Sequence, residues 1–146
     1  MSDKSSTILL VEDDETHAVL IKRCFEDLGL AKVNWTEDGE EALDYLFRRG
    51  EHLDAKRPDL ILLDLRLPKK DGKEVLKEIK SCNELRNIPV IILTTSNNNR
   101  DKRDAYCNHA DDYLVKPLGF DEFRIMIENI GDHWLKENRN RKTHRR

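Results

Sequence analysis

The sequence predicts a doubly wound α/β fold, in which helices cover both faces of a parallel sheet. Three short runs, at residues 7–11, 60–63 and 90–93, are almost entirely apolar and do not alternate with polar residues. Such runs are typical of strands buried on both faces, as in parallel sheets between two helical layers. Residues 32–36 and 112–115 add two strands, the first with the alternation of an edge strand. Five alternations of strand and helix with right-handed crossovers then give helices on both faces.

Apolar residues recur at helical spacing between the strands, which predicts intervening helices with one buried face each. Gly29 and Gly50 are expected to end the first two helices. The segment 97–104 contains no apolar residue, so we expect it to form the most weakly anchored and most mobile helix. The residues expected on the buried faces are Ala18, Ile21, Phe25 and Leu28, then Ala42, Leu43, Leu46 and Phe47, then Val75, Leu76 and Ile79, and finally Phe123, Ile127, Ile130 and Trp134.

Composition excludes several classes of protein. The 146 residues carry a net charge of −3, with 38% charged and 38% apolar residues, and fit a single domain at 1–135. No apolar run could cross a membrane, and the polar amino terminus resembles no secretory signal. Three cysteines without a CxxC pair indicate free thiols and a cytoplasmic protein. Residues 136–146 are basic and lack apolar side chains, so we expect a disordered tail, and nucleic-acid binding is not favoured.

Polar residues that suit a phosphoryl site follow four of the predicted strands. Glu12 and Asp13 follow the first strand, Asp64 the third, Thr94 the fourth and Lys116 the fifth. Taken singly, each has an ordinary explanation, such as helix capping for the acids or a surface charge for the lysine. The carboxyl ends of parallel strands meet at one edge of a sheet, where ligands bind, so these residues are expected to converge.

The chemistry of this set favours transfer of a phosphoryl group to a carboxylate. Three crowded carboxylates favour a hard divalent cation, and Mg²⁺ binds few carboxylates while leaving room for phosphate oxygens. A lysine supplies a positive charge for a phosphoryl oxygen, and a threonine hydroxyl can donate a hydrogen bond. A carboxylate in this setting can act as a nucleophile and form an aspartyl phosphate. No glycine-rich phosphate loop follows the first strand, which argues against a dinucleotide-binding protein or a P-loop protein.

Four motifs carry a resemblance to a known family. ILLVEDD at 8–14, the aspartate of LLDLRLPKKDG at 62–72, ILTTS at 92–96 and DYLVKP at 112–117 resemble, in order and spacing, the response regulator receiver domain of two-component signalling systems. The resemblance covers residues 7 to about 135. It implies a flavodoxin-like five-stranded parallel sheet of order 2-1-3-4-5. It also implies Asp64 as the phosphoacceptor, Thr94 and Lys116 as phosphoryl contacts, and a Mg²⁺ site of Glu12, Asp13, Asp64 and the backbone carbonyl of Arg66.

Further expectations follow from the same resemblance. Tyr113 matches the switch aromatic, which turns inward when the Thr94 hydroxyl moves toward the phosphoryl group. The Lys116–Pro117 peptide bond is expected to be cis. His109 departs from the family, in which glycine usually follows the fourth helix, and Asn108 could take the left-handed conformation instead. The loop before Pro58, the LPKKDG turn and the terminal HWL resemble the small regulators partnered with phytochrome-type histidine kinases.

These features predict a single-domain response regulator that takes a phosphoryl group from a histidine kinase and switches protein contacts. It is expected to have no enzymatic activity beyond phosphoryl uptake and slow autodephosphorylation, with Arg66 and Ser96 setting the rate of phosphoryl loss. A homodimer is expected through the fourth helix, fifth strand and last helix, using Tyr106, Cys107, Tyr113, Trp134 and Leu135. Two alternatives stay open. One is a phosphatase with an aspartate nucleophile, although Arg66 stands where that class needs an acid. The other is an adaptor that works without phosphorylation.

Overall fold

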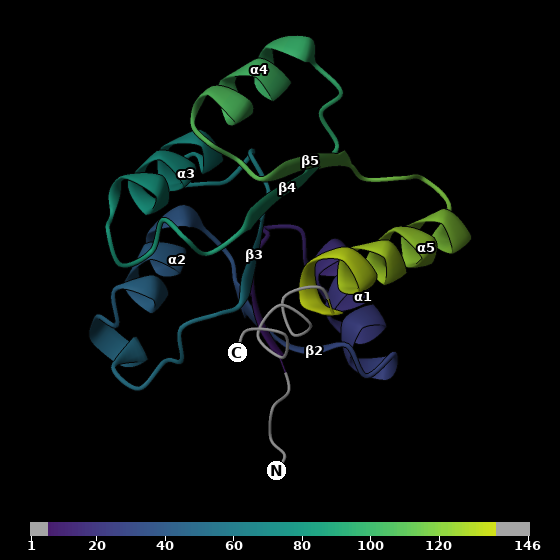
Figure 1. Cartoon of the computed structure of the whole chain (residues 1–146), viewed down its shortest axis with the longest axis horizontal. Helices are drawn as coiled ribbons and strands as arrows, with labels where there is room; N and C mark the ends of the chain where they lie inside the picture. Colours follow the sequence, from purple (N-terminus) through teal and green to yellow (C-terminus); the bar gives the residue numbers. More distant parts are fainter. Residues whose placement is uncertain (1–5, 137–146) are drawn as a thin grey trace, which may run out of the picture.

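A computed structural model describes residues 6–136 of the chain. Five parallel strands form a single sheet in the order β2-β1-β3-β4-β5 (Figure 1). Both the strand order and the doubly wound architecture agree with the prediction. The strands are β1 (Ser6–Val11), β2 (Ala31–Thr36), β3 (Leu60–Leu63), β4 (Val90–Thr94) and β5 (Asp112–Val115).

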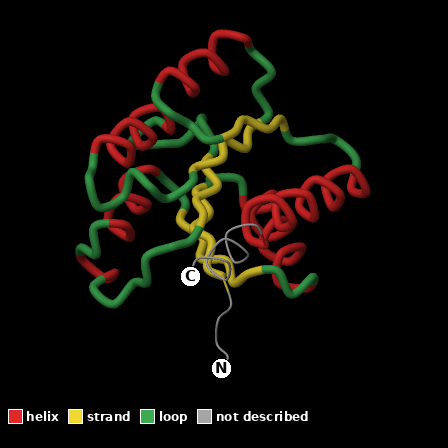
Figure 2. Tube along the Cα trace, in the orientation of Figure 1, coloured by secondary structure: helices red, strands yellow, loops and turns green. Residues whose placement is uncertain are grey.

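Helices cover both faces of the sheet (Figures 1 and 2). Helices α1 (Glu15–Asp27) and α5 (Phe120–Ile130) pack side by side on one face. The opposite face carries α2 (Gly39–Leu46), α3 (Gly72–Ser81) and α4 (Asn99–Cys107). Two short turns complete the described chain, the 3₁₀ turn η1 (Gly50–His52) and the π-helical turn η2 (Gly131–Lys136).

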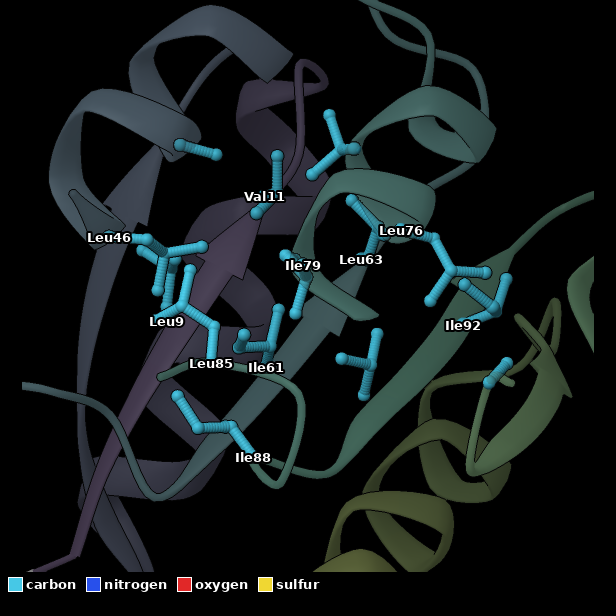
Figure 3. Packing of buried hydrophobic residues seen from close by; sticks show 14 of the residues in the cluster. Leu9, Val11, Leu46, Ile61, Leu63, Leu76, Ile79, Leu85, Ile88 and Ile92 are labelled. Carbon is cyan, nitrogen blue, oxygen red and sulfur yellow. The ribbon is translucent and has the colours of Figure 1, made fainter. Parts of the chain in front are cut away.

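Alternate side chains of the central strands pack in two separate cores, one on each face of the sheet. Leu9, Ile61 and Ile92 point into the core under α2 and α3, which Figure 3 shows from close by. Their neighbours Leu10 and Leu62 point into the core under α1 and α5. Both faces of β1, β3 and β4 are therefore buried, which explains why these strands lack the polar alternation of a half-exposed sheet.

Three expected core residues are less buried than predicted: Leu28 and Trp134 are partly buried and pack against one core, and Phe47 is exposed. Phe47 is exposed because α2 ends at Leu46, and Arg48 then takes a left-handed conformation with φ 56°. Trp134 is only half-buried, and Leu135 is buried in its place. The wider π-helical winding from Gly131 onward changes the angle per residue, so the 3.6-residue period that predicted Trp134 no longer applies there.

Helix α4 agrees with its prediction in one respect and differs in another. Ala105 is its one buried residue, as expected for a segment with few apolar side chains. Its start, however, is well anchored by polar groups, since the Asn98 side chain accepts hydrogen bonds from the backbone N–H groups of Arg100 and Asp101. This polar capping was not anticipated. The mobility of the helix stays a prediction.

Backbone geometry at two further positions answers expectations from the family resemblance. His109 adopts the left-handed conformation itself, with φ 72°, whereas Asn108 has φ −98°. The described residues contain no cis peptide bond, so the expectation of a cis bond at Lys116–Pro117 is wrong. The trans form is the ordinary preference of a bond that precedes proline.

The predicted tail at 136–146 lies outside the described residues, apart from Lys136 at the end of η2. Within 6–136, the helices are too short and too polar to cross a membrane.

Candidate functional site

The polar residues predicted at the strand ends do converge at one edge of the sheet. Lys116 follows β5, and its buried Nζ lies between two acids from other strands. It donates to Oε1 of Glu12, after β1, at 2.6 Å, and to Oδ2 of Asp64, after β3, at 3.2 Å. All three residues are buried, with exposed fractions of 2% for Glu12 and 7% for Asp64 and Lys116. An ammonium group from the end of β5 therefore bridges two carboxylates that follow two other strands.

The backbone around Asp64 holds its carboxylate in place. The backbone N–H of Arg66 donates to Asp64 Oδ1 at 3.2 Å, while Oδ2 accepts from Lys116. The start of α3 packs directly against this loop, and a Cβ on Gly72 would lie 2.3 Å from the Asp64 carbonyl oxygen. Glycine is therefore required at 72 by this close approach rather than by a positive φ.

Three carboxylates form a candidate metal site. One oxygen each from Glu12, Asp13 and Asp64 lies within 4.8 Å of the others. Asp13 is exposed while the other two are buried, so the cluster opens to solvent on one side. Lys116 is the one cation that hydrogen-bonds to this cluster among the described residues, which leaves excess negative charge. A donor set of carboxylate oxygens fits a hard divalent cation.

Burial shifts the ionisation of Glu12. Loss of solvent raises the pKa of this carboxyl from 4.5 to about 7, although Lys116 opposes the shift. The carboxyl group is also fixed in position, because its Oε2 accepts from the backbone N–H of Asp14 at 3.1 Å. Trp35 Nε1 donates to the Glu12 carbonyl at 2.7 Å. A bound cation would favour the ionised form of Glu12, so metal binding is expected to release a proton near neutral pH.

Thr94 and Tyr113 are connected through the loop after β4. Thr94 is fully buried, and its Oγ1 accepts from the backbone N–H of Ser96 at 3.4 Å. The Tyr113 hydroxyl donates to the carbonyl of Ser96 at 2.9 Å, and the residue is 7% exposed. Tyr113 thus points inward in this structure. Its inward turn in response to phosphorylation stays a prediction.

Arg66 and Ser96, the predicted tuning residues, share a partner on α4. Ser96 Oγ donates to Asp101 Oδ2 at 2.6 Å, and the Arg66 guanidinium lies 3.7 Å from the same oxygen. Lys73 of α3 pairs with Asp101 at 2.9 Å and with Asp104 at 2.9 Å. The hydrogen bond from Ser96, followed by that from Lys73, lowers the pKa of Asp101, which therefore stays ionised. This network anchors α4 beside the site.

One residue that contacts the site was missed from the sequence. His17, in the first turn of α1, lies with its Nδ1 3.0 Å from Lys116 Nζ. A histidine in an amphipathic helix gives little signal by itself. Its position four residues after Asp13, in the first turn of the helix that leaves the acidic strand end, could have placed it near the site.

The expected dimer residues differ in their availability. Tyr106 and Cys107 are exposed on α4, as a contact surface requires. Tyr113 and Leu135 are buried, with exposed fractions of 7% and 2%, so their inclusion was wrong. Each instead belongs to one of the two cores of the fold.

Comparison with known proteins agrees with this geometry. Residues 8–128 match the family model of the response regulator receiver domain. The chain is 51% identical over 133 residues to the probable methanogenesis regulatory protein FilR2 of Methanothrix harundinacea, covering 90% of this chain and 85% of FilR2. It is 40% identical over 140 residues to the response regulator Rcp1 of Synechocystis, covering 93% of this chain and 95% of Rcp1.

Solved structures give the same family. The phosphorylated cyanobacterial phytochrome response regulator RcpA superposes with a TM-score of 0.86 at 42% identity, covering 90% of this chain and 94% of RcpA. Rcp1, solved in its Mn²⁺-bound form, superposes with a TM-score of 0.84 over 89% of this chain and 94% of Rcp1. The family match spans most of the chain, and the strand ends of the sheet bring a cluster of acids and a lysine together. The chain therefore belongs to the response regulator receiver domain family of two-component signalling proteins.

Proposed function

We propose that this chain accepts a phosphoryl group from a partner histidine kinase onto Asp64 and thereby switches its contacts with other proteins. The carrying observation is the position of the Asp64 carboxylate. It lies between the Lys116 ammonium and the backbone N–H of Arg66, beside the carboxylates of Glu12 and Asp13. This combination of a held carboxylate, a positive charge and a candidate cation site suits phosphoryl uptake.

In the proposed transfer, an oxygen of the Asp64 carboxylate attacks the phosphorus of the donor phosphohistidine. A P–O bond forms, the P–N bond breaks, and the imidazole nitrogen leaves with the bonding electron pair. Lys116 already donates to Asp64 Oδ2, so its ammonium is positioned to follow charge onto the phosphoryl oxygens. The Thr94 hydroxyl at the end of β4 supplies a further donor for one of these oxygens.

Glu12, Asp13, Asp64 and the backbone carbonyl of Arg66 would hold the divalent cation, which we propose to be Mg²⁺. A bound cation neutralises negative charge on the carboxylates and on the incoming phosphoryl group. The excess negative charge of the cluster supports this assignment. The Mn²⁺-bound form of Rcp1 lends further support.

The proposed switch connects Asp64 to α4. If the Thr94 hydroxyl turned to donate to a phosphoryl oxygen, its Oγ1 would lose the hydrogen bond that it accepts from the backbone N–H of Ser96. Ser96 also accepts from the Tyr113 hydroxyl and donates to Asp101. A shift of this loop would therefore move α4 through the hydrogen bond between Ser96 and Asp101. Because Ala105 is the one buried residue of α4, few apolar contacts oppose its movement.

Arg66 and Ser96 are proposed to set the lifetime of the aspartyl phosphate. Each stands two residues beyond a site residue, and both contact Asp101, so their side chains flank the approach to Asp64. Alanine at either position should change the lifetime severalfold, measured by loss of the phosphoryl adduct over time. Lys77→Ala, which removes an exposed charge on α3, should leave it unchanged. Equal lifetimes in all four proteins would refute this role.

For the partner kinase, the comparisons point in two directions. Similarity to RcpA and Rcp1 supports a kinase of the phytochrome type. The higher identity to FilR2 supports a kinase that serves regulation of methanogenesis. Phosphotransfer from each purified kinase would separate them, because cognate pairs transfer faster than non-cognate ones at equal concentration.

The output is proposed to act through protein contacts in the cytoplasm, consistent with three free cysteines. A homodimer through α4, β5 and α5 is supported by exposed apolar residues there, among them Tyr106, Val115 and Phe120. Sedimentation with and without phosphoryl donor tests this. A mass that stays monomeric at all concentrations in both states would remove the dimer.

Phosphoryl uptake itself is tested by intact mass, comparing wild type with Asp64→Asn. One adduct that the substitution abolishes supports the proposed function. Steady turnover of a phosphate ester would instead support a phosphatase, in which a group other than Arg66 would have to act as the general acid. Absence of uptake from any donor would support a phosphorylation-independent adaptor.

A further inference from the structure

Lys116 has three hydrogen-bond partners at the site, and one of them has no role in the proposed function. The ammonium group donates to Glu12 at 2.6 Å and to Asp64 at 3.2 Å. Its third neighbour is His17 Nδ1, at 3.0 Å. An ammonium group has three N–H donors and no acceptor, so these three contacts use all of its donors. The structure assigns His17 as a positioning residue that orients Lys116 toward the phosphoacceptor, an inference that rests on the proposed function.

The contact fixes the protonation of the imidazole ring. Because Lys116 can only donate, Nδ1 of His17 must carry a lone pair, and the proton of the neutral ring must sit on Nε2. The other charged neighbour of the ring is Asp14, whose Oδ2 lies 3.8 Å from Nδ1, beyond hydrogen-bond distance. An Nδ1–H would gain no hydrogen bond there and would repel the ammonium group. The geometry therefore selects one tautomer.

The position of His17 is set by the start of α1. Asp14 caps this helix, and its side chain accepts from the backbone N–H of His17 at 3.1 Å. The His17 side chain is 33% exposed, at the border between the buried lysine and solvent. A capped backbone and a short side chain give the ring few alternative positions, whereas a lysine side chain is long and flexible. The more rigid partner can therefore hold the more flexible one.

The reaction gives His17 a role that the two acids cannot fill. The hydrogen bond from Lys116 to Asp64 changes when that carboxylate becomes an acyl phosphate. Glu12 belongs to the candidate metal site, and a bound cation would compete with Lys116 for its charge. Of the three acceptors, His17 alone is neither the reacting group nor a candidate metal ligand. Its lone pair can keep Lys116 in place while the other two bonds change.

The test compares two substitutions that differ in the acceptor atom. The amide oxygen introduced by His17→Asn would lie near the place of the imidazole Nδ1, so this variant keeps an acceptor for Lys116, whereas His17→Leu removes it. With Mg²⁺ and acetyl phosphate as the donor, Asp64 gains the phosphoryl group and acetate leaves. The initial rate of this uptake should fall by roughly tenfold to a hundredfold in His17→Leu, as expected for loss of one hydrogen bond to a charged group. The initial rate of His17→Asn should stay within about twofold of the wild-type rate. This is well below the tenfold change that corresponds to about 1.4 kcal/mol.

Two outcomes would overturn the assignment. One is a His17→Leu rate equal to that of wild type or higher, and the other is an equal fall in both variants. Unfolding curves of each variant, measured alongside, exclude loss of the fold as the cause. Failure of wild type itself to take up the phosphoryl group would count against the proposed function, whereas uptake that His17 does not affect would count against this inference alone.

A spectroscopic measurement tests the same contact without any reaction. The ¹⁵N chemical shifts of the His17 ring in the unphosphorylated protein should show an unprotonated Nδ1 and a protonated Nε2 at neutral pH. Asp64→Asn, which leaves the contact between Lys116 and His17 in place, should show the same pattern. A proton on Nδ1 would contradict the assignment, because that ring could not accept from Lys116.

Discussion

Replacement of Glu12 by glutamine tests how burial affects the stability of the site. Burial raises the pKa of Glu12 from 4.5 to about 7, so the folded chain keeps a proton that the unfolded chain has lost between these pH values. Glu12 therefore contributes stability that is fully present below pH 4.5 and is lost as the pH rises through 7. At roughly 1.4 kcal/mol per pKa unit, the free energy of unfolding should fall by about 2 to 3 kcal/mol between roughly pH 5 and pH 8.

Urea unfolding at both pH values, in the absence of divalent cations, measures this loss. Glutamine does not titrate, so Glu12→Gln should lack this part of the pH dependence, while all other groups titrate as in wild type. The difference in free energy of unfolding between the two proteins should change by about 2 to 3 kcal/mol in favour of the variant as the pH rises. A difference that stays constant, or that changes in favour of wild type, would refute the buried, protonated state of Glu12. Added Mg²⁺ should stabilise wild type more at the higher pH, since the cation requires ionised Glu12.

Three further predictions concern the backbone and the switch. His109→Gly should raise the free energy of unfolding by about 1 kcal/mol, because glycine adopts the left-handed φ of 72° without strain. As a control, Asn108→Gly should not stabilise the fold, because Asn108 has an ordinary φ. Gly72→Ala should lower the free energy of unfolding by about 3 kcal/mol, since its Cβ would lie 2.3 Å from the Asp64 carbonyl, and a cost under about 1 kcal/mol would mean that this contact relaxes easily. Tyr113→Phe should lower the free energy of unfolding by about 1 kcal/mol and speed hydrogen exchange in α4, and unchanged exchange would contradict the connection from Tyr113 to α4.

The sheet and most of the site could be predicted because they depend on strong local patterns. Buried parallel strands need continuous apolar runs, and strand ends on one edge bring their following residues together. Glu12, Asp64 and Lys116 could therefore be placed from their positions alone, and the structure joins them by hydrogen bonds. Leu135 replaced Trp134 in the core because π-helical winding does not appear in a pattern read at 3.6 residues per turn.

Other features depend on side-chain geometry that a residue pattern does not contain. The polar anchoring of α4 through Asp101 requires Lys73, 28 positions earlier in the chain, to reach across from α3. The approach of His17 to Lys116 joins residues 99 positions apart. The inward position of Tyr113 depends on a carbonyl group in a loop. Each of these contacts needs the folded chain; the spacing of His17 from Asp13 could place it near the site but not in contact with Lys116.

Asp64 is proposed to accept a phosphoryl group with the help of a divalent cation. The most direct test of this proposal is the intact mass of the protein after incubation with acetyl phosphate, with Mg²⁺ or with EDTA, for wild type and Asp64→Asn. We expect one phosphoryl adduct on wild type with Mg²⁺, little or none with EDTA, and none on the variant. An adduct that persists in Asp64→Asn would place the acceptor elsewhere. Equal uptake with Mg²⁺ and with EDTA would contradict the role given to Glu12 and Asp13.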